Sequence, residues 1–93
     1  MAKVFCEVVR ITDGSPIDAT VMVHSYNGRK EFLQVPSHFV IEESGRKVLP
    51  VSVVGGDTAG RLLLVQLPVE ADSGANRVWV AKESVLHAEE APV

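Results

Sequence analysis

Short runs of apolar residues alternate with turn residues along the whole chain. Gly, Pro, Asn and Asp interrupt the sequence so often that no segment has the length and periodicity of an amphipathic helix. β-branched residues recur within the runs, as is typical of strands. The strand-like runs are Glu7–Ile11, Val21–His24, Glu31–Gln34, Pro50–Val54, Leu62–Leu67 and Arg77–Val80. This pattern predicts an all-β fold, a small SH3-like barrel or a β-sandwich of about six to eight short antiparallel strands.

One short pattern occurs twice. Val35–Ile41 and Val80–Leu86 each begin with an apolar residue that ends a strand-like run, continue through four residues of turn character and finish with two apolar residues. The repetition predicts two related halves, 4–43 and 45–87, within a single domain that spans residues 1–87. Residues 88–93 have the composition of a frayed acidic tail.

The clearest local signal is Asn27-Gly28. These residue types supply the positive φ that a type I′ turn requires at both central positions. A two-residue loop here predicts a hairpin in which Tyr26 faces Arg29, and this register continues along both strands. Further turns are expected at 43–46, 55–60 and 71–76.

Two runs, Leu62–Leu67 and Pro50–Val54, are apolar almost without alternation. Such a pattern indicates that both faces of the strand are covered. A homodimer interface would supply the second cover, and the alternative is a coiled strand that serves two sides of one small barrel. The candidate interface residues are Met22, Leu33, Leu62 and Leu64.

The two copies of the repeated pattern, taken with the strands before them, resemble a known class of fold. In Phe32–Ile41 and Val78–Leu86 a strand closes at Pro or Ala, passes through one 3₁₀ turn and returns to a short last strand, as at the end of an SH3-like barrel. The first copy, continued through Val48, is also similar to the PRC-barrel family. The resemblance implies a small β-barrel. SH3 peptide grooves use clustered aromatic residues, and this chain offers only Tyr26, Trp79 and three Phe, so the resemblance does not extend to polyproline binding.

Composition and charge narrow the classes of function. The net charge of −3 disfavours a dedicated nucleic-acid binder, which usually carries a basic field. Cys6 is the only cysteine, so an intramolecular disulfide and a four-cysteine zinc site are excluded. The N-terminus does not read as a secretory signal, and no run approaches the roughly 20 apolar residues of a membrane helix. We therefore expect a cytoplasmic protein without a membrane partner.

Candidate catalytic and metal-binding groups are few. His24, His38 and His87 do not have the spacing of a metal site. Cys6 lacks the basic sequence neighbour or helix N-terminus that would activate a thiol, which favours a structural role. There is no Gly-x-Ser-x-Gly nucleophile motif. The sequence therefore predicts no enzyme, no cofactor and no metal site.

Basic residues follow turn glycines at three places. If these turns cluster, they would form a positive rim that could contact phosphate or nucleic acid. The simpler explanation is that turns are solvated and that charge at strand edges discourages edge-to-edge pairing. The residues concerned are Arg29, Lys30, Arg46, Lys47 and Arg61.

The features above favour a non-catalytic protein-interaction or scaffold module, acting as a homodimer or with a protein partner. The alternative is an RNA- or ribosome-associated SH3-like barrel that uses the Gly-Arg-Lys turns, so nucleic acid is the less favoured partner. Trp79 has no aromatic neighbour in the sequence, and we expect it to anchor the core or an interface.

Overall fold

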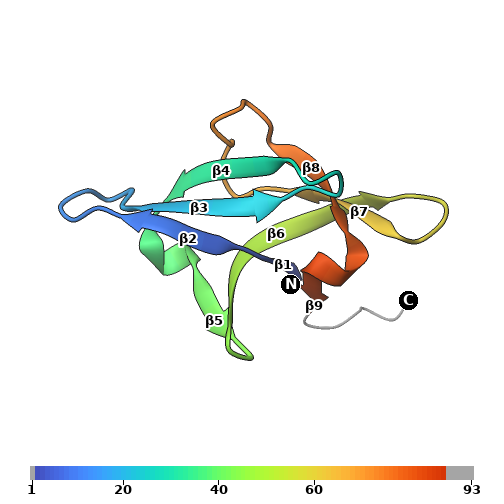
Figure 1. Cartoon of the computed structure of the whole chain (residues 1–93), viewed down its shortest axis with the longest axis horizontal. Helices are drawn as coiled ribbons and strands as arrows, with labels where there is room; N and C mark the ends of the chain where they lie inside the picture. The colour runs from blue at the N-terminus through green and yellow to red at the C-terminus, as the bar shows by residue number, and fades with distance from the viewer. Residues whose placement is uncertain (1, 88–93) are drawn as a thin grey trace.

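Strands make up most of the structure, a computed structural model that describes residues 2–87 (Figure 1). The acidic tail predicted at 88–93 lies outside the described residues. Two single 3₁₀ turns, η1 (Ser37–Phe39) and η2 (Lys82–Ser84), interrupt the strands. The strands are β1 (Ala2–Phe5), β2 (Glu7–Ile11), β3 (Ala19–His24), β4 (Lys30–Val35), β5 (Ile41–Glu43), β6 (Arg46–Gly56), β7 (Leu62–Gln66), β8 (Arg77–Ala81) and β9 (Val85–His87). The prediction of an all-β domain is confirmed.

The strands form two antiparallel sheets. The larger has the order β8-β7-β6-β1-β9, with β5 paired to β6 off this path, and the smaller has the order β2-β3-β4. Within residues 2–87 the sheets do not close into a barrel. The described residues form nine strands rather than six to eight, because the chain breaks at Cys6 between β1 and β2 and because the short returning segments β5 and β9 also pair.

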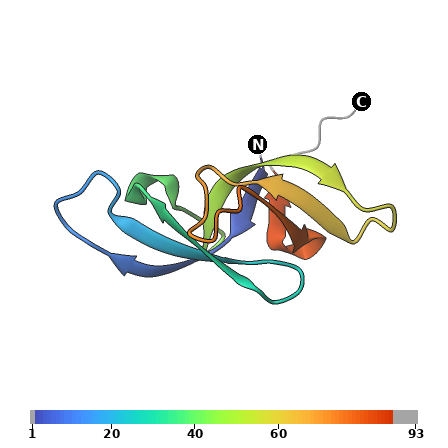
Figure 2. The ribbon, with the colours of Figure 1, turned by 90° about the horizontal axis from the view of Figure 1, so that it is seen from above.

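The two halves share one architecture. Each has a long N-terminal stretch, two further strands, a 3₁₀ turn and a short last strand. The β2–β3 loop of the first half and the β6–β7 loop of the second lie at opposite ends of the long axis (Figure 2). The ladders β2–β3 and β6–β7 each contain one register shift, after Val8 and after Val53, which are 45 positions apart. The residues before η1 and η2 have nearly the same backbone angles, φ −61° and ψ 139° at Pro36 and φ −64° and ψ 141° at Ala81. The predicted pair of related halves therefore extends to strand register.

The halves meet where β1 pairs with β6. Val4 faces Leu49, and these two residues occupy equivalent positions, 45 apart, so the approximate two-fold axis that relates the halves passes between them. Both side chains are fully buried in a core that also contains Val21 and Leu33 from the smaller sheet. One continuous core thus holds both sheets together.

The β3–β4 hairpin differs from the prediction by one residue. Gly28 has φ +84°, but Asn27 does not have positive φ, so the type I′ turn predicted here is wrong. The Gly28 N–H donates to the Ser25 carbonyl oxygen (3.0 Å), and the Ser25 N–H donates to the Arg29 carbonyl oxygen (2.9 Å). The loop therefore has three residues, the frequent alternative in which a glycine with positive φ follows a tight turn. As a result His24 faces Lys30 instead of Glu31.

A turn with positive φ at both central residues occurs instead between β5 and β6. Ser44 has φ +54° and Gly45 has φ +77°, and Glu43 faces Arg46 across them. Ser44 adopts a conformation that L-residues other than Asn and Asp rarely use. The sequence predicted a turn at 43–46 but did not predict its type.

The candidate interface residues lie in two environments. Met22 is 6% exposed and Leu33 is fully buried, so this chain alone covers both side chains and leaves nothing of Leu33 for a partner. Leu62 and Leu64 in β7 are half-buried, and a contact with a second copy there stays a prediction. None of the helical turns in residues 2–87 is long or apolar enough to cross a membrane.

Candidate functional site

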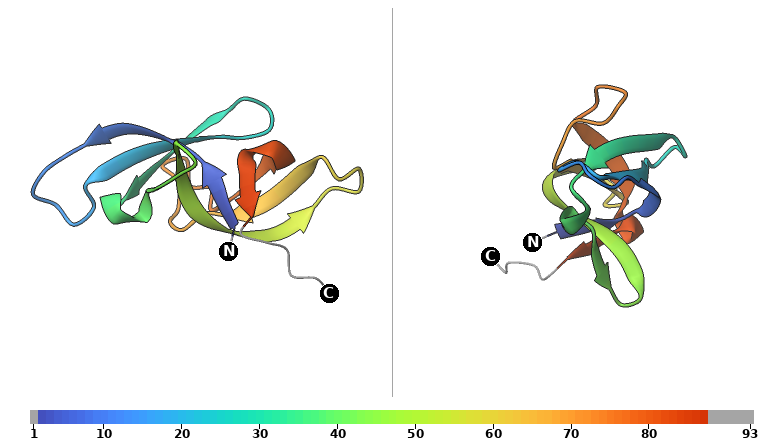
Figure 3. Two further views of the ribbon diagram at one scale, coloured as in Figure 1. Left: turned by 90° about the horizontal axis from the view of Figure 1, so that it is seen from below. Right: turned by 90° about the vertical axis from the view of Figure 1, so that its left-hand side faces the viewer.

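The two outer strands of the smaller sheet differ in what lies beside them. The segment between β7 and β8 packs along β4, as the right-hand view of Figure 3 shows. The Asp72 N–H donates to the Phe32 carbonyl oxygen (2.8 Å), and the Gln34 amide donates to the Asp72 carboxylate (3.0 Å). The Ser73 hydroxyl donates to the buried carboxylate of Glu31 (2.7 Å). The edge of β4 is therefore covered.

Strand β2, at the other edge, is open. It pairs with β3 on one side, and no strand among residues 2–87 pairs with it on the other. Four of its five residues are exposed, including Val9 (54%) and Ile11 (59%). An exposed edge strand presents main-chain N–H and C=O groups to which another extended segment can add.

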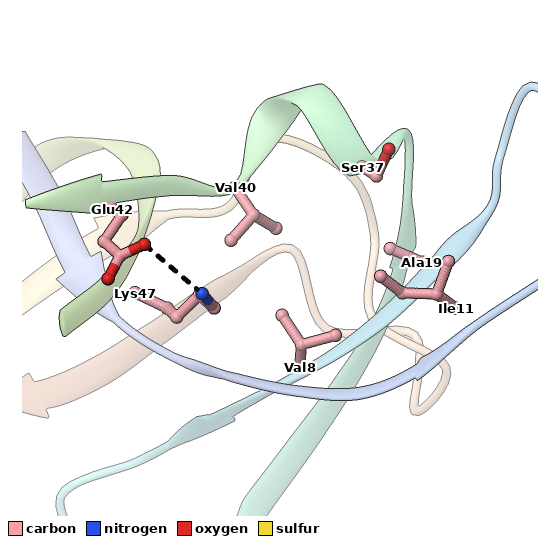
Figure 4. A pocket seen from close by; sticks show the side chains of 7 residues that line it. All are labelled: Val8, Ile11, Ala19, Ser37, Val40, Glu42 and Lys47. Atoms are coloured by element: carbon pink, nitrogen blue, oxygen red, sulfur yellow. Dashed lines mark ion pairs between the residues drawn. The ribbon is translucent and has the colours of Figure 1, made fainter.

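A pocket of about 240 Å³ lies beside this edge, between β2 and the segment that runs from η1 to β5 (Figure 4). We refer to it as the β2 pocket. Most of its wall is aliphatic, and a charged pair lies at one end. Its lining residues are Val8, Ile11, Ala19, Ser37, Val40, Glu42 and Lys47.

Two polar contacts fix the walls of the β2 pocket. The Asp18 carboxylate accepts hydrogen bonds from the N–H of Ser37 (2.6 Å) and from its hydroxyl (3.0 Å), which ties η1 to the start of β3. The Ser37 N–H, more than any other group, holds the pKa of Asp18 below its usual value of 3.8. Lys47 Nζ lies 3.7 Å from Glu42 Oε1 at the opposite wall. The first contact joins two segments distant in the sequence, and the second lies within the β5–β6 hairpin.

A second pocket, of about 170 Å³, lies where the β3–β4 turn approaches β8 and the β6–β7 hairpin. Its lining residues are Tyr26, Asp57, Leu62 and Trp79, and we refer to it as the Tyr26–Trp79 pocket. The Tyr26 N–H donates to the Trp79 carbonyl oxygen (2.8 Å), which holds the turn against β8. The Tyr26 side chain is exposed, whereas Trp79 is half-buried.

Asp57 is the only carboxylate in the lining of the Tyr26–Trp79 pocket. Its Oδ1 atom accepts hydrogen bonds from the N–H groups of Arg61 (2.8 Å) and Leu62 (3.0 Å). These bonds, that of Leu62 first, hold the pKa of Asp57 below its usual value of 3.8, so the carboxylate is ionised at neutral pH. Its Oδ2 atom accepts no hydrogen bond from the part of the chain that the structure describes.

The predicted positive rim does not form as one surface. Arg46 and Lys47 lie on the β5–β6 hairpin at the lower edge of Figure 1, away from the β3–β4 turn and the β6–β7 loop. The Arg46 guanidinium stacks over the Phe5 ring at 3.7 Å, and Lys47 pairs with Glu42. The turns that carry Arg29, Lys30 and Arg61 do come together, at the Tyr26–Trp79 pocket.

Cys6 is half-buried at the break between β1 and β2. Burial raises the pKa of its thiol to about 11, although the nearby charge of Lys47 opposes the shift. A thiol with this pKa is almost entirely protonated at neutral pH and is a poor nucleophile. Within residues 2–87 no group of three or more His, Cys, Asp or Glu side chains is placed to hold a metal ion.

Comparison of the chain with models of known families, with curated proteins and with solved structures found no match.

Sequence reasoning missed both pockets, because residues distant in sequence form them. Trp79 has no aromatic sequence neighbour, and Tyr26 reaches it only through the packing of one half against the other. The exposed apolar residues Val9 and Ile11 were a usable signal, since they interrupt the polar positions of an edge strand.

Proposed function

We propose that this protein is a non-catalytic interaction module that binds an extended segment of a partner protein along β2. The observation that carries the proposal is the β2 pocket beside a strand edge that no other strand within residues 2–87 covers. In this mode of recognition, main-chain hydrogen bonds to the edge supply affinity, and a pocket for one side chain supplies specificity. The aliphatic lining predicts that the partner offers an apolar side chain such as Leu or Ile at that position.

Charge and the register shift restrict what can add to β2. Glu7 and Arg10 are exposed, and the ladder slips between Val8 and Arg10. Both features discourage indiscriminate strand addition. Selection would therefore depend on the β2 pocket, with the Glu42–Lys47 pair available to polar groups of the partner.

The test is selection of peptides from a short random library on wild-type protein, on Ile11→Lys and on Ile17→Lys. Ile11 and Ile17 are exposed to almost the same extent, 59% and 56%, but only Ile11 lines the β2 pocket. We expect peptides selected on the wild type to bind Ile17→Lys and to lose at least about tenfold in affinity for Ile11→Lys. Bound peptide should shift the NMR signals of the β2 amides and of Val40.

Two results would overturn the proposal. One is a failure to select any peptide, and the other is equal binding to both lysine variants. Light scattering adds a third outcome, in which the chain of 10.0 kDa doubles its mass and Ile11→Lys restores the monomer. The β2 edge would then join two copies of this chain rather than bind a separate partner.

The nucleic-acid alternative now depends on the turns that carry Arg29, Lys30 and Arg61. Binding to single-stranded RNA that weakens steeply with salt and is lost on neutralising these residues would favour it. Salt-independent peptide binding at the β2 edge favours the interaction module.

A further inference from the structure

The Tyr26–Trp79 pocket has a composition unlike that of the β2 pocket. Two aromatic residues and an aspartate with an ionised carboxylate line a pocket of about 170 Å³, together with the half-buried Leu62. Tyr26 is the only tyrosine of the chain and Trp79 is its only tryptophan. We propose that this pocket binds a cationic side chain of a partner protein, a guanidinium or a methylated ammonium.

The chemistry of the lining supports a cation. The face of an aromatic ring attracts positive charge, most strongly for groups whose charge is spread over several poorly hydrated atoms. An anion would meet the carboxylate of Asp57, and a purely aliphatic group would offer no hydrogen-bond donor to its Oδ2 atom. A cation uses both the aromatic residues and the charge of Asp57.

The position of Asp57 is built into the fold. Its Oδ1 atom caps the N–H groups of Arg61 and Leu62 and so closes the β6–β7 loop. This arrangement leaves Oδ2 to accept a hydrogen bond from an incoming guanidinium or to lie against a methylated ammonium. The backbone hydrogen bond from Tyr26 to Trp79 fixes the opposite wall. The cation therefore enters a site that is already formed.

The size and shape of the pocket favour a side chain over a free molecule. The pocket has a volume of about 170 Å³. This accommodates a head group of four heavy atoms, such as guanidinium or trimethylammonium. Because the pocket opens to solvent, a free ion would keep much of its hydration, whereas a side chain is held in place by the rest of its protein.

Three basic residues lie close to the Tyr26–Trp79 pocket, either near a lining residue in the sequence or hydrogen-bonded to such a neighbour. None of the three is among its lining residues. Arg29 follows the Tyr26 turn, Arg61 precedes Leu62, and the Lys82 N–H donates to the Arg61 carbonyl oxygen (2.9 Å). These charges oppose a bound cation and would assist a bound phosphate. Neutralising one of them therefore separates the two kinds of ligand by the sign of its effect.

The experiment is a titration with N-acetyl trimethyl-lysine amide, followed by Trp79 fluorescence and by NMR at constant ionic strength. Its matched control is the neutral isostere in which a tert-butyl group replaces the trimethylammonium. We expect saturable binding of the cation and at least about threefold weaker binding of the isostere. Equal affinity for both would overturn the proposal, because the pocket would then be merely apolar. So would the absence of any saturable change with the cation.

Four variants locate the effect. Tyr26→Leu should weaken binding by about 3- to 30-fold, whereas Tyr26→Phe keeps the ring and the affinity. Asp57→Asn retains the amide oxygen that caps Arg61 and Leu62 but removes the charge, so it should weaken binding without opening the loop. Arg61→Gln should strengthen binding about twofold. A loss of affinity in Arg61→Gln, together with binding of a single-stranded RNA, would reassign the pocket to nucleic acid.

This site is independent of the proposed peptide site along β2. Ile11→Lys should leave trimethyl-lysine binding unchanged, and Tyr26→Leu should leave the selected peptides bound. Failure at one pocket is thus distinguishable from failure at the other.

Discussion

The two halves of this molecule share the same strand pairing, but at one equivalent pair of positions the large and the small side chain have exchanged strands. In the first half Ile11 on the outer strand faces Ala19 on the middle strand. In the second half Gly56 faces Leu63. The large residue therefore stands on the open edge strand in one half and on the middle strand in the other.

This exchange explains why the β2 pocket exists. Ala19 is buried and ends at Cβ, so it leaves space beside β3 that Ile11 borders from the edge. Leu63 packs instead against the core cluster, and a Cβ placed on Gly56 would lie 3.6 Å from Leu63 Cδ2. One backbone plan thus leaves space beside the small Ala19 in the first half and places the large side chain of Leu63 against the core in the second.

The largest effect is expected at the centre that both halves share. Leu49→Ala removes a fully buried side chain beside the two-fold axis and should cost about 2–5 kcal/mol in the free energy of unfolding. Because Leu49 belongs to the one core that spans both sheets, unfolding should stay a single transition by circular dichroism and by Trp79 fluorescence. Two separate transitions would show that the halves are independent units.

The next effect compares equivalent hairpin loops. Gly28 (φ +84°) and Gly74 (φ +95°) each donate an N–H to the carbonyl oxygen three residues earlier. A Cβ on Gly28 would meet no atom within 4 Å, so Gly28→Val acts through backbone strain alone. We expect a loss of about 1–3 kcal/mol, and a similar loss for Gly74→Val, in urea unfolding. An unchanged midpoint in either variant would remove positive φ from the description of that loop.

A smaller effect on stability, but a decisive one on binding, should follow from exchanging the differing pair. The double variant Ile11→Gly and Ala19→Leu gives the first half the residues of the second. The volumes nearly compensate, so the free energy of unfolding should change by less than about 1.5 kcal/mol. The leucine would fill the β2 pocket, and peptides selected on the wild type should no longer bind. Retained binding would show that Ala19 does not control the pocket.

Much of the fold was predictable because its signals are local. Turn residues and apolar runs located most strands, and the repeat at Val35–Ile41 and Val80–Leu86 indicated two halves. The position equivalent to Cys6, 45 residues later, is the buried Val51, and a structural role for the thiol stays a prediction. The error at Asn27-Gly28 arose because glycine with positive φ suits both two-residue and three-residue loops.

The sites were not predictable because they depend on contacts between segments distant in the chain. The β2 pocket is lined by β2, β3 and the segment from η1 to β5, and Tyr26 meets Trp79 only across the two halves. Neither arrangement can be recognised from the spacing of residues along the sequence. Met22 and Leu33 illustrate the opposite case, since their apolar character suggested an interface although the monomer buries them.

The smallest effect concerns two carboxylates, that of Asp18, which ties the start of β3 to η1, and that of Asp57, which closes the β6–β7 loop. The pKa values of Asp18 and Asp57 lie below 3.8 in the folded protein, through hydrogen bonds from the N–H groups of Ser37 and Leu62 respectively. A lowered folded pKa contributes stability that is fully present above the unfolded value near 3.8 and is lost as the pH falls through the folded value. Urea midpoints should therefore be insensitive to these groups between about pH 5 and pH 7 and should decline below about pH 4. Asp18→Asn and Asp57→Asn should each flatten that decline.

At pH 7 Asp18→Asn should be the less stable of the two variants. The amide nitrogen that replaces Oδ2 of Asp18 cannot accept the hydrogen bond from the Ser37 hydroxyl, whereas Asp57 accepts both of its hydrogen bonds through Oδ1. The reverse order would mean that charge, rather than the number of hydrogen bonds, decides how much each carboxylate contributes to the free energy of unfolding.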